Sequence, residues 1–173
     1  MEIYDLIRSR RTVRTFKPDP VPDEVLHKIL QAGRMAPSSS DSQPWHFIVI
    51  NNRETLKTLG GICTQGAFLA DAPMAIAFIM DNAPRPDLDA GRAIQQMELV
   101  AWSEGLGTCF VGLRQIEQMN QVKELLGIPA EMELITLLPF GYREEGFKTK
   151  GATRKPMSDM VHHERFGQKY LAS

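Results

Sequence analysis

The chain has 173 residues, 43% of them hydrophobic, which suits one domain with a sizeable core or one protomer of an oligomer. Its 20 lysines and arginines nearly balance its 21 aspartates and glutamates, so the overall charge does not indicate a nucleic-acid or membrane partner. No apolar run is long enough to span a membrane, and the first residues lack the apolar core of a signal peptide. We therefore expect a single domain over residues 1–173, in the cytoplasm.

The first half of the chain predicts helices and two buried strands. Apolar residues at helical spacing predict helices over 2–10 and 23–35, with a proline-rich segment between them. A nearly continuous apolar run predicts a strand over 45–50 that is covered on both faces. Residues 53–71 predict short helices broken at Gly60-Gly61 and Gly66, before a second buried strand over 73–80.

The second half begins with the longest predicted helix, over 88–104, whose wide apolar belt indicates a central helix or one that also packs on another subunit. Strands over 108–113 and 132–142 and a helix over 116–126 follow. From residue 143 the chain turns polar, and we expect this tail to wrap a surface of its own or of a partner. Strand direction is not readable from the pattern, so periodicity leaves both α/β and α+β open.

Motifs that carry chemistry by themselves are lacking in this sequence. Gly105-x-Gly107 follows a helix and precedes a strand, the wrong order for a dinucleotide-binding turn. Adjacent His162 and His163 would point apart on a helix, which makes a metal site improbable. Asp87 and Asp89 are interpreted as solvated surface carboxylates. Without an acid–base dyad or a nucleophile triad, an enzyme of this composition would rely on a cofactor.

A basic cluster stands out in a chain whose formal net charge is only −1. Its arginines are Arg8, Arg10, Arg11 and Arg14. The planar fork of arginine holds a phosphate with two parallel hydrogen bonds and keeps its proton, so a small anionic ligand is one interpretation. The other is a solvated helix end, where the helix dipole favours cations. Taken alone, the cluster slightly favours the solvated helix end.

Two segments together change that balance. Arg10–Phe16 (Arg-Arg-Thr-Val-Arg-Thr-Phe) and Pro37–Trp45 (Pro-Ser-Ser-Ser-Asp-Ser-Gln-Pro-Trp), with the predicted helix over 23–35 between them, closely resemble the signature of the FMN-dependent nitroreductase family. Later features are also similar to the family: Gly-Leu-Gly before a strand, a strand that ends in Pro-x-Gly, and a Lys-Pro in a basic tail. The resemblance therefore covers nearly the whole chain.

The resemblance implies an α+β fold of three layers, with a mostly antiparallel central sheet flanked by helices. It also implies an intertwined homodimer that binds FMN at the subunit interface, with a C-terminal arm, about 147–173, wrapping the partner. One subunit is expected to contact the phosphate, the ribityl chain and the pyrimidine edge through Arg10, Arg11, Thr12 and Arg14. The other subunit is expected to place beside the same flavin Pro37, Ser38, Ser39 and Asp41.

Further cofactor-binding residues follow from the same resemblance. Arg154 is expected to complete the phosphate site, with Lys150 as a companion. Gln65 is expected to place its amide against the pyrimidine ring. The flavin's reactive N5 edge is expected to meet the backbone of Val111, Gly112 and Leu113. An open, shallow substrate site could have as its walls Phe68, Phe110 and Leu113, although core packing is the simpler role for each.

The activity implied is an NAD(P)H-dependent FMN oxidoreductase in which the flavin, and no side chain, carries the chemistry. In a ping-pong scheme, NADH or NADPH would reduce the flavin, and a nitroaromatic, a quinone or free flavin would reoxidise it. The alternative is a flavin store or sensor without turnover, suggested by Asp41 where the family commonly has Asn and by Phe68 near the place of a lysine; anaerobic bleaching by NADH or NADPH separates the two. A nucleic-acid binder is disfavoured by the balanced charge.

Overall fold

The computed structural model describes residues 2–148 and 150–170, and a four-stranded sheet lies at its centre. The strands are β1 (Trp45–Ile50), β2 (Met74–Met80), β3 (Leu106–Thr108) and β4 (Glu133–Tyr142). They lie in the order β1-β2-β4-β3, and all three pairings are antiparallel. The expected α+β fold with a mostly antiparallel sheet is confirmed, which resolves the choice that periodicity leaves open.

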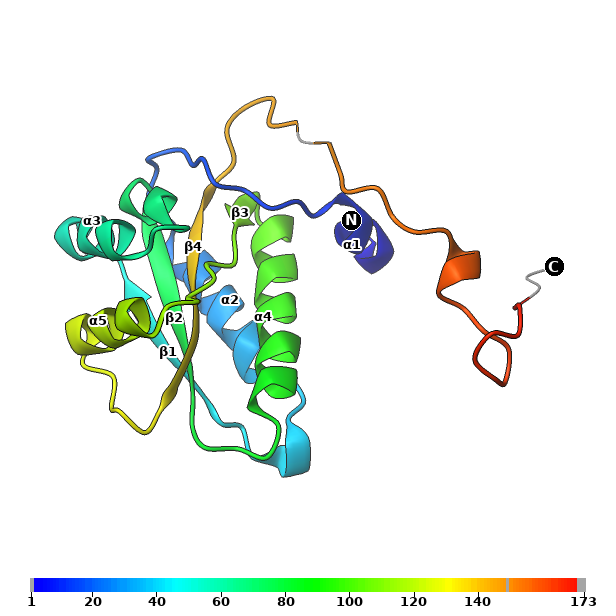
Figure 1. Ribbon diagram of the computed structural model, residues 1–173. Helices are drawn as coiled ribbons and strands as arrows, with labels where there is room; N and C mark the ends of the chain where they lie inside the picture. Colours follow the sequence, from blue (N-terminus) through cyan, green and yellow to red (C-terminus); the bar gives the residue numbers. More distant parts are fainter. Residues whose placement is uncertain (1, 149, 171–173) are drawn as a thin grey trace.

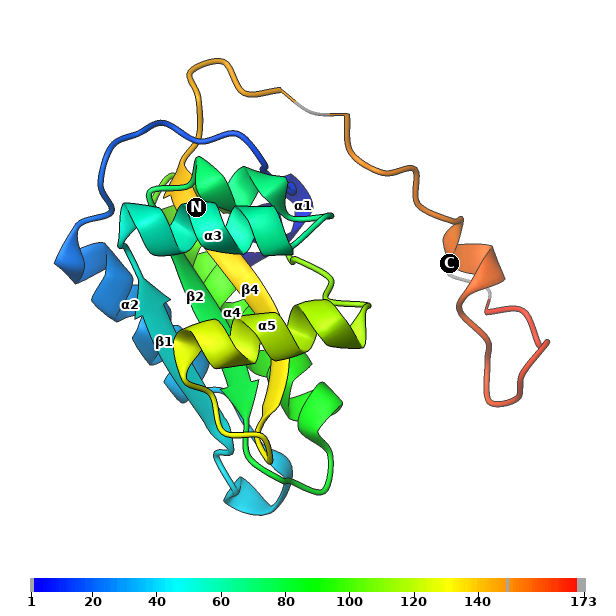
Figure 2. The same ribbon diagram turned by 60° about the vertical axis from the view of Figure 1, so that its left-hand side comes forward.

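Helices cover both faces of this sheet and give the molecule its three layers (Figure 1, Figure 2). One layer holds α2 (Asp23–Arg34) and α4 (Pro86–Ser103), which pack against each other. The opposite layer holds α3 (Arg53–Ile62) and α5 (Ile116–Leu126). The core is correspondingly split into two clusters, one on each side of the sheet.

The central strand β2 is buried along its whole length, as its continuous apolar run predicts. Its residues alternate between the two clusters because successive side chains of a strand point to opposite faces. Those in the cluster shared with α2 and α4 are Met74, Ile76, Phe78 and Met80. Those in the cluster shared with α3 and α5 are Ala75, Ala77 and Ile79. The sheet therefore forms a rigid partition between two hydrophobic layers.

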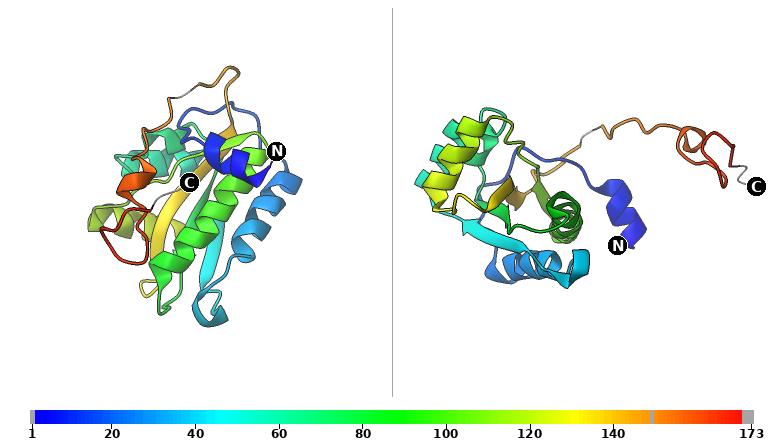
Figure 3. Two further views of the ribbon diagram at one scale, coloured as in Figure 1. Left: turned by 90° about the vertical axis from the view of Figure 1, so that its right-hand side faces the viewer. Right: turned by 60° about the horizontal axis from the view of Figure 1, so that its bottom comes forward.

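The two ends of the chain lie outside these layers (Figure 1, Figure 3). Helix α1 (Ile3–Ser9) buries no residue and is tied to α4 by a hydrogen bond of 3.1 Å from Trp102 Nε1 to Ser9 Oγ. Beyond β4 the chain extends away from the sheet and includes a short 3-10 helix, η3 (Met157–Asp159). Within residues 2–148 and 150–170, no helix combines the length and hydrophobicity that a membrane crossing requires.

The predicted helix break at Gly60-Gly61 is wrong, because α3 continues through both glycines to Ile62. A Cβ atom on Gly60 would lie 2.8 Å from Ala70 Cβ and 2.9 Å from the Ala67 carbonyl oxygen. The glycine therefore permits the close approach of the 3-10 helix η2 (Ala67–Ala70) and does not end α3. The chain turns at residues 63–66 instead.

The predicted strand over 108–113 is also wrong in its bounds. The strand β3 comprises Leu106–Thr108, and beyond it Val111 forms an isolated bridge with Leu137. Gly107 lies inside β3 because its missing side chain leaves room for buried Val13, whose Cβ would be 2.4 Å from a Cβ on Gly107. This contact holds the arginine-rich segment against the sheet.

Replacing Gly107 should therefore weaken the fold. Gly107→Ala is expected to lower the free energy of unfolding by about 1–3 kcal/mol through overpacking against Val13. Gly91→Ala is a matched control: it lies in α4 with open space around it, so alanine should stabilise by about 0.5–1 kcal/mol. Urea unfolding measures both changes, and equal free energies for the two variants would contradict this account of β3.

Candidate functional site

The arginine-rich segment lies beside β3 as a short extended stretch. Thr12 pairs with Thr108 in a parallel bridge, and the backbone amide of Val13 donates to the carbonyl oxygen of Thr108 at 3.0 Å. Val13 is buried, whereas Thr12 and Arg14 on either side of it are exposed. Because alternate residues of an extended chain face opposite directions, one buried valine presents its polar neighbours at the surface.

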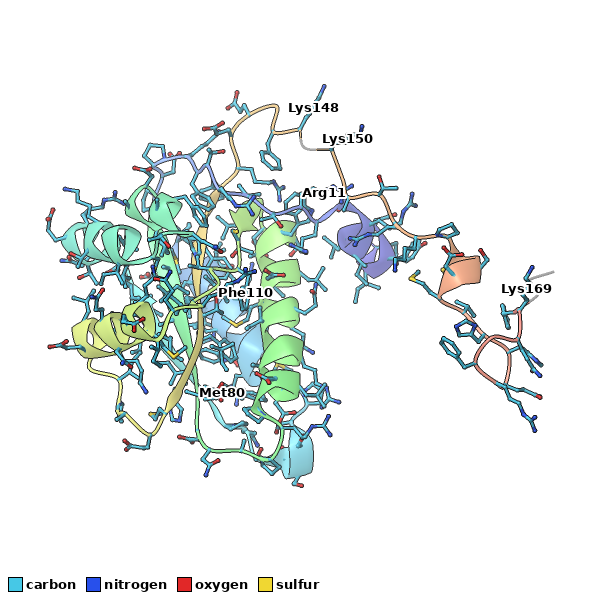
Figure 4. All side chains as sticks on the ribbon, viewed as in Figure 1. Arg11, Met80, Phe110, Lys148, Lys150 and Lys169 are labelled. Carbon is cyan, nitrogen blue, oxygen red and sulfur yellow. The ribbon has the colours of Figure 1, made fainter. Side chains whose placement is uncertain are left out.

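Basic side chains from the N-terminal segment and the C-terminal arm line one hollow of about 730 Å³. The lining residues are Ile7, Arg8, Arg10, Arg11, Thr12, Arg14, Lys150, Gly151, Ala152 and Arg154. Figure 4 shows Arg11 and Lys150 near each other, where these two parts of the chain come together. Among the described lining residues none is acidic. The structure thus gathers the expected phosphate-site residues into a single cationic hollow.

Arg11 links the two segments that form this hollow. Its Nη1 donates to the carbonyl oxygens of Arg8 at 2.6 Å and Arg10 at 2.9 Å, at the end of α1. A Cβ on Gly151 would lie 2.9 Å from Arg11 Nη2 and 3.1 Å from Nε, so the arm passes directly beside the Arg11 guanidinium. The hydrogens on Nε and Nη2 are the donors that Arg11 retains on the side of the arm.

Arg10 forms an ion pair with a buried carboxylate. Its Nη1 lies 3.6 Å from Oε2 of Glu98 on α4, and the Glu98 residue is only 8% exposed. Burial raises the pKa of Glu98, and the positive charge of Arg10 opposes this rise. Glu98 therefore anchors one cation of the hollow to the central helix.

A second group of expected residues lies next to the hollow. A Cβ on Gly66 would lie 2.6 Å from Val111 Cγ1, so the turn that contains Gln65 packs directly against the connection after β3. Arg14 joins this group to the hollow, because its guanidinium carbon lies 6.0 Å from the centroid of the Phe68 ring, at the limit of a cation–π contact. Gln65 itself is exposed.

The backbone of residues 111–113 is only partly available to a ligand. The amide of Val111 already donates to the carbonyl oxygen of Leu137 at 3.2 Å and lies 3.2 Å from Thr136 Oγ1. Within the described chain, the amides of Gly112 and Leu113 make no such hydrogen bond. Of the three residues, these two can therefore donate to a bound molecule.

The three candidate walls of the substrate site differ in burial. Phe68 and Leu113 are partly buried and pack against the cluster beneath α3 and α5. Phe110 is 50% exposed, so a core role for it is wrong. A side chain of this size at the surface beside residues 111–113 is free to contact a ligand or a partner chain.

The remaining expected residues lie elsewhere in the protomer. Pro37, Ser38, Ser39 and Asp41 belong to the loop between α2 and β1, which includes the 3-10 helix η1 (Ser39–Asp41). This loop lies at the opposite end of α4 from α1, near the end of β2 that Met80 marks (Figure 1, Figure 4). None of its residues lines the cationic hollow.

Asp89 holds this serine-rich loop in place. Both of its carboxylate oxygens lie 3.0 Å from the backbone nitrogen of Ser39, and Oδ1 accepts from Ser39 Oγ at 3.1 Å and lies 3.4 Å from Arg92 Nη1. Asp89 is fully buried, so its interpretation as a surface carboxylate is wrong, whereas Asp87 is exposed. Asp89 shares one helix face with Ala93, which is also fully buried.

The two halves of the expected site are thus anchored at different points of α4. Ser39 is bound at Asp89, and Arg10 is paired with Glu98. Glu98 follows Asp89 by nine positions, a separation of about 14 Å along the helix axis. One protomer therefore does not bring the two halves together, an arrangement that a second copy of the chain could complete.

Sequence reasoning misses both anchors, although helical spacing offers a signal for each. Asp89 precedes Ala93 by four residues, and Glu98 follows Ile94 by four, so both acids fall on apolar faces of the helix. A charge at such a position needs a partner.

Among the described residues, no group of three or more His, Cys, Asp or Glu side chains is placed to hold a metal ion.

Comparison with known proteins identifies the family. The model of the Nitroreductase family matches residues 7–87 and 64–142. A relative from Methanothermobacter thermautotrophicus, named "Putative NADH dehydrogenase/NAD(P)H nitroreductase", is 34% identical over 156 residues, covering 87% of this chain and 82% of the relative. The chain belongs to the nitroreductase family. The resemblance inferred from the two signature segments is confirmed.

Solved structures of the nitroreductase family share its fold. A protein from Bacteroides thetaiotaomicron that bears the same name superposes with a TM-score of 0.87 at 28% identity, over 95% of this chain and 98% of that one. An FMN-dependent nitroreductase from Clostridium difficile superposes with a TM-score of 0.81 at 30% identity, over 93% and 98% of the two chains. Nearly the whole length of this chain thus follows the architecture of the family.

The raised pKa of Glu98 should appear in the pH dependence of stability. The folded chain holds the Glu98 proton more tightly than the unfolded chain does, so the free energy of unfolding should fall as pH rises through the interval between the two pKa values. Glu98→Gln removes this titration and should flatten the curve over that interval. Urea unfolding in steps from about pH 4 to pH 8 measures the difference, and parallel curves for the two proteins would contradict it.

Proposed function

We propose that this chain is an FMN-dependent NAD(P)H oxidoreductase that works as a homodimer, with each flavin site built from two protomers. The observation that carries the proposal is the cationic hollow, in which the basic residues of the N-terminal segment and of the arm converge. The names of the family relatives, which include an NAD(P)H nitroreductase and an FMN-dependent nitroreductase, support an oxidoreductase over a flavin store.

The residues of the hollow suit the phosphate end of FMN. A phosphomonoester carries a charge of about −1.5 to −2 near neutral pH, and arginine forks match its oxygens in geometry as well as in charge. Arg10, Arg154 and Lys150 would hold the phosphate, with the remaining donors of Arg11 beside them. The hydroxyl of Thr12, which lines the same hollow, suits the alcohol groups of a ribityl chain.

Bound FMN would supply the redox chemistry, taking hydride from NADH or NADPH and then passing the electrons to an acceptor such as a nitroaromatic, a quinone or free flavin in alternating half-reactions. The protein contributes a fixed environment. Arg14, held beside Phe68, would place a positive charge at the pyrimidine edge, where it favours negative charge on the ring. The free amides of Gly112 and Leu113 would donate to the ring edge, and Gln65 would approach it from the neighbouring turn.

A protein nucleophile has no part in this scheme. Cys109 lies close enough to Arg14 for the two to interact, yet burial raises the pKa of its thiol, with Arg14 opposing the rise. The thiol therefore stays protonated near neutral pH and behaves as a small buried apolar group. This supports assigning the chemistry to the cofactor alone.

A second protomer would complete the site. Pro37, Ser38, Ser39 and Asp41 lie too far along α4 to reach the hollow of their own chain, and we propose that they line the flavin of the partner. The exposed apolar side chains of α1 and the arm support extensive contact between two chains. These side chains are Ile3, Tyr4, Ile7, Met157, Met160, Phe166 and Tyr170.

Removing a cation from the hollow should loosen the cofactor. Arg10→Ala and Arg154→Ala are each expected to weaken FMN binding about 10- to 100-fold, because a hydrogen bond to a charged group contributes about 1.5–3 kcal/mol and 1.4 kcal/mol corresponds to tenfold in Kd. Titration of the flavin-free proteins with FMN, followed by flavin fluorescence, measures the dissociation constants.

The matched control is Lys57→Ala, which removes one positive charge from the exposed face of α3, where Lys57 pairs with Glu54. This variant should bind FMN as the unmodified protein does. If both arginine variants bind FMN as tightly as the Lys57 variant, the assignment of the hollow to the cofactor phosphate is wrong.

A further inference from the structure

A buried carboxylate outside the cationic hollow, Asp89, is hydrogen-bonded to the loop that forms the second half of the proposed flavin site. We propose that Asp89 is a positioning residue: it fixes the Ser38–Gln43 loop in the shape that receives the partner's flavin, without touching the flavin itself. The inference rests on the proposed function, because only the dimeric site gives this loop a ligand.

The loop has a conformation that local preference does not favour. Three of its residues that are not glycine have positive φ angles: Ser40 at 55°, Asp41 at 53° and Gln43 at 46°. Backbone in the left-handed region is unfavourable for such a residue and persists only where surrounding contacts enforce it. Something outside the loop must therefore hold it.

Asp89 provides that hold from the first turns of α4. Its carboxylate accepts the backbone amide and the hydroxyl of Ser39 at 3.0 and 3.1 Å, and Arg92 lies 3.4 Å away on the next turn. A buried carboxylate needs this many donors to offset its lost hydration, and each such charge-assisted bond is stronger than a neutral one. The loop thus supplies the hydrogen-bond donors that the buried Asp89 carboxylate needs, and the carboxylate in turn fixes the position of the loop.

Hydrogen bonds inside the loop restrict its conformation further. The amide of Gln43 donates to Ser38 Oγ at 2.9 Å, and the side-chain amide of Gln43 donates to Asp41 Oδ1 at 3.1 Å. The Asp41 carboxylate is thereby tied to its own loop. The family commonly has Asn at the position of Asp41, and a carboxylate cannot donate hydrogen bonds as an amide does. Here the side-chain amide of Gln43 lies beside the Asp41 carboxylate and supplies such hydrogens.

The arrangement changes the role expected for Ser39. Its amide and its hydroxyl proton are both directed to Asp89, so neither is free to donate to a flavin in this conformation. Ser39 acts as the point of attachment, and the exposed residues that follow it carry the loop surface. Removing Asp89 should therefore disturb the whole loop and not one contact.

The first test is FMN binding by Asp89→Asn, which keeps the size of the side chain but removes its charge. We expect its Kd for FMN to rise about tenfold or more, measured by fluorescence titration of the flavin-free protein well below its melting temperature. Asp87→Asn is the matched control, with the same chemical change two residues earlier on an exposed side chain, and its Kd should stay within twofold. A purely structural role would lower the melting temperature and leave the Kd unchanged.

Two comparisons separate the failure of this inference from that of the proposed function. If Arg154→Ala weakens FMN binding while Asp89→Asn matches Asp87→Asn, the role of Asp89 is overturned and the cofactor site stands. If Arg154→Ala also binds FMN normally, the proposed site itself is wrong.

A second measurement needs no variant and covers the case in which Asp89→Asn does not fold. In the unmodified, flavin-free protein, the Ser39 amide should exchange with deuterium more slowly than the amide of exposed Ser40, since Asp89 holds the Ser39 amide before any cofactor binds. Equal exchange rates for Ser39 and Ser40 would overturn the inference.

Discussion

Concentrated positive charge at one end of α4 is the feature on which the rest of the site depends. Six cationic side chains line one hollow, namely Arg8, Arg10, Arg11, Arg14, Lys150 and Arg154. Like charges brought together repel, and among the described cations of the hollow it is Arg10 that forms an ion pair with Glu98. A small anion of charge near −2 would relieve this repulsion, which is why a phosphate-bearing cofactor suits the hollow better than a neutral ligand.

Helix α4 connects the cationic hollow to the hydrophobic core and to the serine-rich loop. It packs against α2 and the sheet, so its position is fixed by the core. Its two buried acids, Asp89 and Glu98, then hold surface residues at defined places along the helix. Glu98 fixes a cation of the hollow, and Asp89 fixes the serine-rich loop at the other end. Because a helix has a fixed rise per residue, the distance between these anchors is also fixed. Two copies, and not one flexible chain, would bring both ends to one ligand.

Much of this arrangement is predictable from the sequence wherever one physical signal dominates. The strand β1 and the helix α5 have the predicted bounds because hydrophobic pattern and flanking turn residues agree. The concentration of arginines in residues 8–14 is visible in the sequence, but by itself it slightly favours a solvated helix end over an anion site. The family resemblance is what assigns these arginines, together with Lys150 and Arg154, to an expected phosphate site.

The failures have physical causes of their own. Gly60 and Gly107 allow neighbouring segments to pack closely. The sequence alone does not distinguish a glycine that permits such a contact from one that ends a helix. Asp89 and Glu98 were hidden because an acid in an amphipathic helix is usually solvated, and only its tertiary partners reveal otherwise. Which residues of the proposed site would come from which copy of the chain is likewise not readable from residue spacing, because it depends on the length of α4 between Asp89 and Glu98.

Hybrid dimers test the central claim, that each flavin site draws on two protomers. One chain would carry Arg10→Ala, and the other, separable by a tag, would carry a bulky Ser39→Trp substitution that distorts the serine-rich loop. If the site is shared, each hybrid combines both lesions in one site and leaves the other intact, so hybrids should bind one FMN per dimer with the affinity of the unmodified protein. If each site lies within a single protomer, both sites of the hybrid would carry a lesion, and the absence of any tight-binding site would contradict the account.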